Sequence, residues 1–311
     1  MAEWTADIDV DAPLATRLVR TQFPELATAT VEPFGVGWDN AAFLMDGHVV
    51  FRFPRRRIVA GLIEREVAIL PSIAPRLPLA ISAPHFIGKA TGGYPWIFAG
   101  YELIDGSTAC SVVLSDKSRT ALAQPLARFL RALHDVEPAE FVARGLPPDE
   151  IGRLDHHKRL GITRKRIATL TASGHFEGED IFTAWLDAHP PPPLGDAERR
   201  LVHGDLYARH ILLDDRARPT GIIDWGDVHL GDPALDIAIA HLILPSSAHE
   251  VFRAAYGPID DRTWNTARYR AIYHAILELD YGIREDDAGM REIGSAALRL
   301  IRAAIVSAKG I

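Results

Sequence analysis

Residues 201–227 read LVHGDLYARHILLDDRARPTGIIDWGD, and this stretch decides the fold of the chain. Its three short apolar runs are bounded by Gly, Pro and Asp, a pattern typical of strands, and they lie at 201–202, 211–213 and 222–223. The last two runs should form a hairpin, because the residues between them favour a turn. That hairpin would return Asp224 to the end of the sheet that holds Asp205 and His210, so we expect these three side chains to converge.

Two carboxylates and an imidazole in this arrangement suit phosphoryl transfer. The reaction needs a carboxylate that orients or deprotonates the attacking hydroxyl, and ligands for the divalent ions that neutralise the triphosphate. We assign the first role to Asp205 and the second to His210 and Asp224. The spacing from His203 to Gly226 also matches the kinase pattern H-x-D-x-x-x-x-N followed by D-x-G. A lone H-x-D is common in turns, where Asp only caps a loop, but several motifs occur here in order.

The segments HGDLYARH, GIIDWGD and DPALD resemble, in this order, motifs of the aminoglycoside phosphotransferase family, the antibiotic kinases with a protein-kinase-like fold. The likeness is greatest to the aminoglycoside and macrolide phosphotransferases, whose loop carries His where protein kinases carry Asn. The resemblance implies an α+β fold of two lobes. The small β-rich N-lobe with its hinge, over residues 1–103, would bind the nucleotide. The larger, mostly helical C-lobe, over residues 104–311, would hold the catalytic and acceptor-binding residues.

The composition fits an ordinary globular protein. The 311 residues are 24% charged and 48% hydrophobic, and the formal net charge is -7. A negative balance disfavours a nucleic-acid or anionic-membrane partner, which would need a basic face. The single cysteine, Cys110, excludes an internal disulfide framework and suits a reducing compartment. The sequence shows no signal peptide and no apolar run near the roughly 20 residues of a membrane span, so we expect a cytoplasmic protein.

Residues 31–53 should form a strand, a glycine turn and a hairpin around Asp46-Gly47. Gly35 and Gly37 lie in the glycine turn, where backbone N–H groups could close over phosphates. Two glycines alone are more often only a turn, and their place before the next motif raises their interest.

Arg52 stands where the family resemblance implies a strand lysine directed at the nucleotide phosphates. Arginine keeps the positive charge and can hold phosphate in a forked geometry. Residues 60–70 predict a helix that stops before Pro71, with Glu66 facing inward. A buried acid needs a partner, and the resemblance implies that Glu66 pairs with Arg52. The alternative is an exposed i, i+4 pair on the helix surface.

Residues 94–106 should form a strand and an extended link between the lobes. The resemblance implies that this link offers backbone groups to the nucleotide base, namely the Glu102 C=O and the Ile104 N–H. Ile223, just before Asp224, joins them as a nucleotide-binding residue.

The sequence predicts two further helices in the C-lobe. Residues 115–134 predict an amphipathic helix capped by Ser115 or Asp116, with Pro125 kinking or splitting it. Asp236 should begin the helix 235–244 and accept hydrogen bonds from the backbone N–H groups of the catalytic loop.

An acidic cluster follows the predicted helix that begins at Tyr269. The cluster could form an anionic wall for a cationic acceptor, or only a solvated helix end; its members are Glu278, Asp280, Glu285, Asp286 and Asp287. Asp227 could help to bind metal or shape the acceptor site.

These observations predict a phosphotransferase that uses Mg²⁺ and ATP or GTP to modify a hydroxyl of a small-molecule acceptor, an antibiotic. The acidic cluster favours an aminoglycoside, whereas the wording of the motifs is equally similar to macrolide kinases, and a small metabolite is a further alternative. A second class is a metal-dependent hydrolase. Its metal ligands would be the four side chains His203, Asp205, His210 and Asp224. A third is an inactive nucleotide-binding module.

Overall fold

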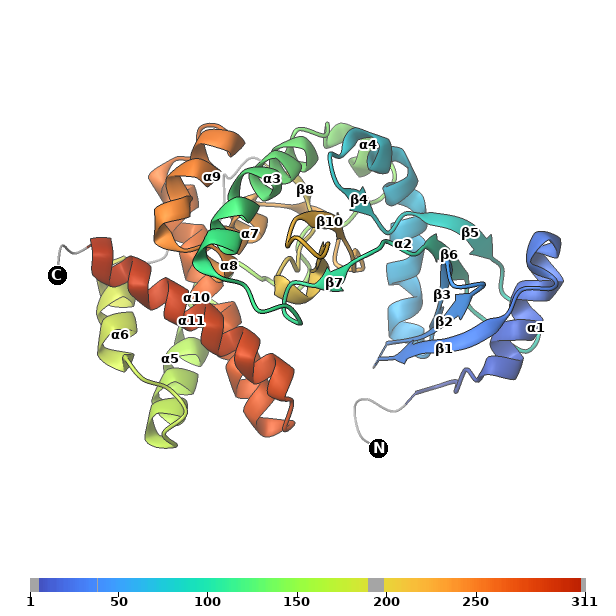
Figure 1. Cartoon of the computed structure of the whole chain (residues 1–311), viewed down its shortest axis with the longest axis horizontal. Helices are drawn as coiled ribbons and strands as arrows, with labels where there is room; N and C mark the ends of the chain where they lie inside the picture. Colours follow the sequence, from blue (N-terminus) through green and yellow to red (C-terminus); the bar gives the residue numbers. More distant parts are fainter. Residues whose placement is uncertain (1–5, 38, 190–198, 309–311) are drawn as a thin grey trace. The chain divides into compact units, whose positions relative to one another are not determined.

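The computed structural model describes residues 6–37, 39–189 and 199–308 (Figure 1). The chain forms two compact units. The first unit comprises Met1–Asp105 and Gly221–Val228, and the second comprises Gly106–Thr220 and His229–Ile311. The segment 221–228, which carries Asp224, therefore belongs with the N-terminal residues.

The first unit is built on a five-stranded antiparallel sheet in the order β1-β2-β3-β6-β5. Its strands are β1 (Val31–Val36), β2 (Asn40–Met45), β3 (Val49–Pro54), β5 (Pro84–Gly88) and β6 (Phe98–Glu102). Asp46 and Gly47 join β2 to β3 with φ values of 47° and 72°, the left-handed conformation that such a tight hairpin requires. The predicted Asp-Gly turn is confirmed.

Alternation along the strands separates the two faces of this sheet. Phe51 in β3 faces α1 (Ala12–Gln22) and joins the aromatic core there. Arg52 and Tyr101 point to the opposite face, toward α2 (Arg57–Ile73), as period-2 side-chain alternation requires. Figure 1 shows α1 and α2 on opposite sides of the sheet.

The helix α2 corrects one expectation, because it does not stop before Pro71. It continues to Ile73 and is followed by the 3₁₀ turn η2 (Ala74–Arg76). A proline this close to a helix end removes one backbone hydrogen bond, and the buried Leu70 and Ile73 on either side keep the last turn packed. The short β4 (Ala80–Ile81) then pairs in parallel with Gly221 and Ile222 of β10 (Pro219–Ile222).

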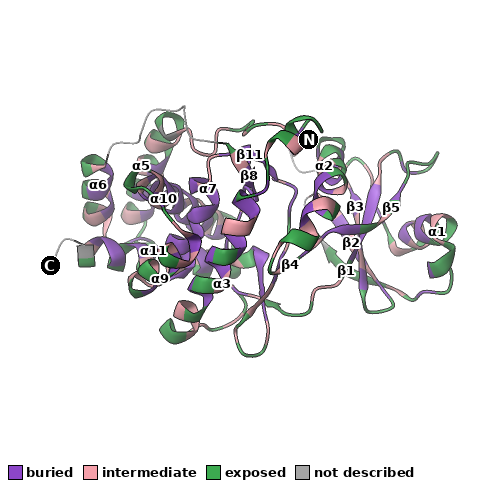
Figure 2. Cartoon of the chain, turned by 90° about the horizontal axis from the view of Figure 1, so that it is seen from above, coloured by how far each residue is buried: buried purple, intermediate pink, exposed green. Residues whose placement is uncertain are grey.

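The second unit is mostly helical, and α10 lies at its centre. In Figure 2 α10 is largely buried, whereas α5 and α6 have exposed outer faces. The helix α10 packs against α5, α7, α8 and α11, and α3 packs against α9. The helices are α3 (Asp116–His134), α4 (Ala139–Val142), α5 (His156–Ala172), α6 (Glu179–Ala188), α7 (Ala234–Ile237), α8 (Ile239–Ile243), α9 (His249–Tyr256), α10 (Asp261–Arg284) and α11 (Ala288–Ala308).

The helices predicted over residues 115–134 and 235–244 agree only in part with the structure. Ser115 caps α3 by accepting a 3.1 Å hydrogen bond from the N–H of Ser118, as predicted. Pro125 does not split α3, which is continuous because apolar residues on both sides of the proline, from Leu122 to Leu133, are buried. The helix expected over residues 235–244 is instead two short ones, α7 and α8, separated at Ala238.

The strands of the second unit are short. Two antiparallel pairs are formed by β7 (Ser107–Thr108) with β9 (Ile211–Leu213), and by β8 (Arg200–Val202) with β11 (His229–Gly231). The predicted apolar runs at 201–202 and 211–213 are therefore strands. The remaining 3₁₀ turns are η1 (Pro24–Leu26), η3 (Ala208–His210) and η4 (Ser246–Ala248). Within the described ranges, none of the helices has the length and apolarity to span a membrane.

Candidate functional site

The loop that leaves β8 is held in place by Asp236. The Asp236 carboxylate accepts hydrogen bonds from the backbone N–H groups of His203 (2.7 Å) and Gly204 (3.0 Å), as predicted. His134 Nε2 lies 3.2 Å from the same carboxylate. Gly204 has φ of 91°, a conformation that favours glycine. This buried anchor fixes the backbone just before Asp205.

Asp205 is held ionised by its surroundings. Burial opposes its ionisation, but the basic groups around it outweigh burial and keep the pKa of Asp205 below its usual value. In order of decreasing effect these groups are His274, His210, Arg270 and His203. The nearest full charge is on Arg270, whose Nη2 lies 3.6 Å from Asp205 Oδ1. The carboxylate therefore has a defined orientation and accepts, rather than donates, hydrogen bonds.

The two histidines of the loop have fixed tautomers. The Asp205 N–H donates to His203 Nδ1 at 3.2 Å, so this nitrogen carries no proton and His203 supports the loop. His210 Nδ1 lies 2.8 Å from the Asp205 carbonyl oxygen, which can only accept. His210 therefore carries a proton on Nδ1, which leaves Nε2 as the nitrogen that could ligate a metal.

Two ionisable side chains on α10, Arg270 and His274, were missed by the sequence analysis, and they lie in one row with the predicted Glu278. Arg270, His274 and Glu278 recur every four residues on a mostly apolar helix, and each is less than a tenth exposed. Arg270 faces Asp205, the Tyr207 ring packs against His274, and His274 Nε2 lies 3.2 Å from Glu278 Oε1. The signal was the polar i, i+4, i+8 spacing within YRAIYHAILEL.

Glu278 also lines a cavity of about 330 Å³ within the second unit. Neither carboxylate oxygen of Glu278 has a hydrogen-bond donor among the described residues, although His274 is within ion-pair distance. Apolar side chains of α8 and α11 and of the loop before α3 form much of the remaining wall, among them Val112, Leu242, Ile243 and Ile293. A buried carboxylate without donors favours a cationic ligand beside it.

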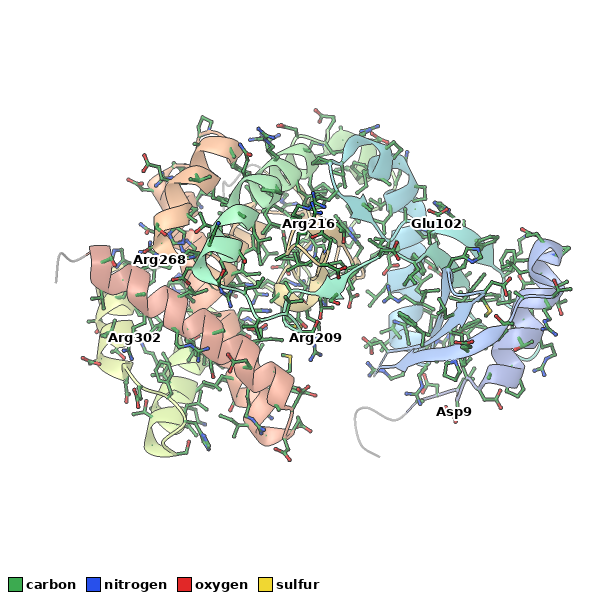
Figure 3. The ribbon with its side chains drawn as sticks, viewed as in Figure 1. Asp9, Glu102, Arg209, Arg216, Arg268 and Arg302 are labelled. Atoms are coloured by element: carbon green, nitrogen blue, oxygen red, sulfur yellow. The ribbon has the colours of Figure 1, made fainter. Side chains whose placement is uncertain are left out.

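The other acidic residues of the predicted wall behave differently. Asp280 pairs with Arg166 (3.0 Å) and Arg284 (3.3 Å), so its charge is already balanced within the protein. Glu285 is exposed at the end of α10. Asp287 nearby caps α11 and lies 3.6 Å from Arg209, which Figure 3 labels. Of the residues predicted for the anionic wall, Glu278 is the buried one, and their contact with an acceptor stays a prediction.

The first unit assembles the predicted pair of Arg52 and Glu66. Arg52 Nη1 donates to Glu66 Oε1 at 3.1 Å and to Oε2 at 3.4 Å, while Arg52 Nη2 lies 3.5 Å from Asp224 Oδ1. Glu66 is fully buried, and Tyr101 Oη donates to its Oε2 at 2.5 Å. Asp224 has φ of 64°, a left-handed conformation that aspartate tolerates. The inward position of Glu66 is confirmed, and Tyr101 is an additional member that sequence reasoning missed.

Charge coupling in this group follows from burial. Burial raises the pKa of Glu66, against the lowering effects of Arg52 and of the Tyr101 hydrogen bond. Burial alone would lower the pKa of Arg52, but Glu66, Tyr101 and Asp224 together raise it. Arg52 therefore stays a permanent cation with one side toward the buried Glu66 and the other toward the half-exposed Asp224.

The glycine turn departs from the expectation in one respect. The Gly37 N–H donates to the Asn40 carbonyl at 2.9 Å, and the Gly37 carbonyl accepts from Arg55 at 3.1 Å. That N–H is thus used inside the hairpin and is not directed at a ligand. Gly35 lies at an irregularity in the register of β1 against β2 and is exposed.

The remaining predicted nucleotide residues lie along β6, the link and the segment after β10. Glu102, labelled in Figure 3, ends β6. Its side chain is exposed, with Oε1 3.4 Å from His85 Nδ1. The Ile104 side chain packs over Gly221, where a Cβ atom would come within 2.8 Å of it. Ile223 and Asp227 are half-buried members of the first unit. Their contacts with a nucleotide or an acceptor stay predictions.

The described part of the chain contains no group of three or more His, Cys, Asp or Glu that could hold a metal ion. The predicted ligands His210 and Asp224 belong to different units.

Comparison with known proteins gives one family model, that of the phosphotransferase enzyme family, which matches residues 30–272. Among curated proteins, viomycin phosphotransferase of Streptomyces vinaceus is 27% identical over 201 residues, 63% of this chain and 67% of that protein. An uncharacterized protein of Bacillus subtilis (strain 168), YcbJ, is 34% identical over 64 residues. That match spans only 21% of either protein.

Solved structures share the fold over most of the chain. An aminoglycoside 2′-phosphotransferase in complex with GDP is 24% identical with a TM-score of 0.67, covering 96% of this chain and all of that one. A macrolide 2′-phosphotransferase from Brachybacterium faecium is 25% identical with a TM-score of 0.55, covering 88% of this chain and 92% of that one. The predicted α+β, kinase-like fold is confirmed by these neighbours.

Proposed function

Because this chain belongs to the phosphotransferase enzyme family, we propose that it transfers the γ-phosphoryl group of ATP or GTP to a hydroxyl of an amine-bearing antibiotic. The observation that carries the proposal is the contact of one cation, Arg52, with both the buried Glu66 and the half-exposed Asp224. A kinase needs a cation held beside the carboxylate that binds its metal, because the triphosphate carries several negative charges. A hydrolase or a loop cap has no use for this pair.

The residues of the first unit suit a nucleotide with Mg²⁺. Magnesium prefers oxygen ligands and takes many of them from phosphates and water, so a site of one or two protein groups suffices. Within the first unit, Asp224 offers a carboxylate. His210, in the second unit, offers an imidazole and stays the second predicted ligand. Bound Mg²⁺ would neutralise charge on the phosphates during transfer. Arg52 would hold the same phosphates, while Gly35, Glu102, Ile104 and Ile223 remain the candidates around the rest of the nucleotide.

Asp205 would act on the acceptor. Its ionised carboxylate would accept a hydrogen bond from the attacking hydroxyl, orient it and take its proton as the phosphoryl bond forms. Arg270 and the backbone anchor at Asp236 fix the position of that carboxylate, so much of the acceleration would come from positioning.

The charge of the acceptor is inferred from Glu278. The buried Glu278 carboxylate, which receives no hydrogen bond from the described residues and lies on the wall of a cavity, would receive an ammonium group of the acceptor. We propose an aminoglycoside, and the alternative is a macrolide, since the apolar wall of the cavity suits a less polar amine. The relatives with solved structures include both classes.

The test is Mg²⁺-dependent consumption of ATP and of GTP, measured separately against aminoglycosides, macrolides, viomycin and small metabolites. Stimulation by one amine-bearing class, with phosphate found on the acceptor, is the expected result. Stimulation by neutral metabolites alone would remove the antibiotic from the proposal. Hydrolysis of substrates without any nucleotide would favour the metal-dependent hydrolase instead. Nucleotide binding without turnover on the whole panel would favour the inactive module.

A further inference from the structure

The chain carries arginine at the position where kinases direct a lysine at the nucleotide, and this creates a problem of geometry. Arginine and a carboxylate readily form a bidentate pair, in which two guanidinium nitrogens donate parallel hydrogen bonds, one to each carboxylate oxygen. Such a pair between Arg52 and Glu66 would use the donor edge that a phosphate needs. A lysine ammonium has no planar fork and cannot be captured in this way.

In the structure this bidentate pair does not form. Only Nη1 of Arg52 contacts Glu66, at 3.1 Å from Oε1 and 3.4 Å from Oε2. The other nitrogen, Nη2, lies 3.5 Å from Asp224 instead. The guanidinium is therefore turned so that one nitrogen points inward to Glu66 and the other points to the metal-ligand candidate.

Tyr101 lies where it prevents the bidentate pair of Arg52 with Glu66. Its hydroxyl donates to Glu66 Oε2 at 2.5 Å, so this oxygen already has a strong donor. The Tyr101 ring also lies beneath the guanidinium, with the Arg52 Cζ atom 5.7 Å from the ring centroid. Tyr101 is 2% exposed and Glu66 is fully buried, so neither can swing away to admit a second nitrogen of Arg52.

The exposed fractions show which side of Arg52 a ligand can reach. The side chain of Asp224 is 50% exposed and that of Arg52 is 20% exposed, whereas Glu66 has no exposed surface. The exposed partner of the guanidinium is therefore Asp224, on the Nη2 side, where a phosphate group can approach it. The orientation set by Tyr101 is the one that leaves this side available for it.

We propose that Tyr101 is a positioning residue of the phosphotransferase. It prevents Arg52 from donating to Glu66 with both terminal nitrogens, and so turns Nη2 toward the nucleotide phosphates. The inference rests on the proposed function, because it assumes that Arg52 contacts a nucleotide. It also accounts for arginine in place of lysine at residue 52: the arginine serves only where a second donor occupies Glu66. Tyr101 and Arg52 should consequently be coupled in binding.

The test is a double-mutant cycle on nucleotide binding, with Tyr101→Phe and Arg52→Lys alone and together. Calorimetry would measure the affinity for the Mg²⁺–nucleoside triphosphate and, separately, for the nucleoside. In the native Arg52 background, Tyr101→Phe should weaken triphosphate binding about tenfold and leave nucleoside binding within twofold, a size typical of one charge-assisted hydrogen bond. In the Arg52→Lys background, Tyr101→Phe should change triphosphate affinity by less than twofold, because lysine cannot form the bidentate pair.

Tyr94→Phe is the matched control. Tyr94 is also a fully buried phenol of the first unit, and its hydroxyl donates to the Pro54 carbonyl at 2.7 Å, away from Arg52. Its removal should lower the melting temperature at least as much as Tyr101→Phe does and leave triphosphate affinity unchanged. An equal loss of affinity in both Tyr variants would mean that a general loosening of the sheet is responsible, and would overturn the proposal.

Two further outcomes separate this inference from the proposed function. Absence of nucleotide binding by the unmodified protein would refute the kinase itself. Normal binding with a Tyr101→Phe effect that is the same in both residue-52 backgrounds, or below twofold in the native one, would refute only the role of Tyr101. If Arg52→Lys abolishes binding, the crystal structure of Tyr101→Phe decides: Nη2 moved onto Glu66 supports the proposal, and Nη2 still beside Asp224 contradicts it.

Discussion

The Oδ2 atom of Asp236 accepts a 2.7 Å hydrogen bond from the backbone N–H of His203, thirty-three residues earlier in the chain. The same carboxylate binds the N–H of Gly204 and lies 3.2 Å from His134 Nε2. All of these groups are inside the second unit and without access to water, so the carboxylate satisfies donors that would otherwise be unpaired. The position of Asp205 therefore depends on a residue that does not contact the substrate.

Asp236→Ala should destabilise the protein by about 3–5 kcal/mol, because it leaves buried donors and His134 without their shared partner. It should also lower kcat by more than tenfold, since the loop before Asp205 loses its anchor. Chemical denaturation and steady-state kinetics would measure the two effects. Asp232→Ala is the control: the Asp232 carboxylate accepts a hydrogen bond from the Ala234 N–H at 2.9 Å, and the loss of this bond should cost about 1 kcal/mol. Equal effects of the two substitutions would contradict the anchor.

Arg270→Met should lower kcat by about tenfold to a hundredfold, the order of loss seen when a reacting group is misplaced. The reason is that Arg270 Nη2 is the cation nearest to Asp205, 3.6 Å from its Oδ1 atom. The KM for nucleotide should stay within twofold, because Arg270 is a residue of the second unit and Arg52 is one of the first. Arg270→Lys, which keeps the charge, should recover much of the rate. A kcat unchanged by Arg270→Met would show that Asp205 needs no orienting cation.

Glu278→Gln should raise the KM of an amine-bearing acceptor about tenfold to a hundredfold, as expected for the loss of a buried charged hydrogen bond. The KM for nucleotide should not change. Glu285→Gln is the control, since Glu285 is exposed at the end of the same helix and should leave both constants unaltered. Equal effects of the two variants, or no effect of Glu278→Gln on any cationic acceptor, would remove Glu278 from the acceptor site.

The stability of the protein should fall in mild acid because of His249. Burial, with a contribution from Arg268, lowers the pKa of His249 from 6.5 to about 4. Between these values the unfolded chain binds a proton that the folded protein does not, so stability rises with pH across this window. The difference of 2.5 pKa units corresponds to about 3 kcal/mol lost on going from above pH 6.5 to pH 4.

Denaturation of the native protein and of His249→Gln across pH 4–7 would measure this effect. The variant should show a shallower dependence on pH by about the same 3 kcal/mol. His157→Gln, a change at an exposed histidine of α5, should leave the dependence as it is. Parallel curves for the native protein and His249→Gln would contradict the neutral state of the part-buried His249.

Much of this structure could be predicted where the pattern is local. The turn at Asp46-Gly47 needs two left-handed residues in succession, and few pairs other than Asp-Gly or Asn-Gly provide them. The inward position of Glu66 follows from helical periodicity, and the bonds of Asp236 follow from the need of a buried carboxylate for donors. In each case one short segment carried the information.

The misses arose where tertiary packing decides. Pro71 is a strong stop signal, yet α2 continues because buried neighbours on both sides support its last turn. Gly37 suggested a phosphate loop, but its N–H is used within the hairpin. Arg270, His274 and Tyr101 were overlooked because the row on α10 and the alternation in β6 identify a face, and only the three-dimensional structure shows what that face meets.

The most direct test compares the unmodified protein with Asp205→Asn in a single-turnover reaction with γ-labelled nucleotide, Mg²⁺ and the best acceptor. The account predicts that the unmodified protein moves the label to the acceptor. Asp205→Asn should bind nucleotide with unchanged affinity and transfer the label at least a hundredfold more slowly, within the range that a positioned general base contributes. Transfer by Asp205→Asn at the native rate would contradict the central claim.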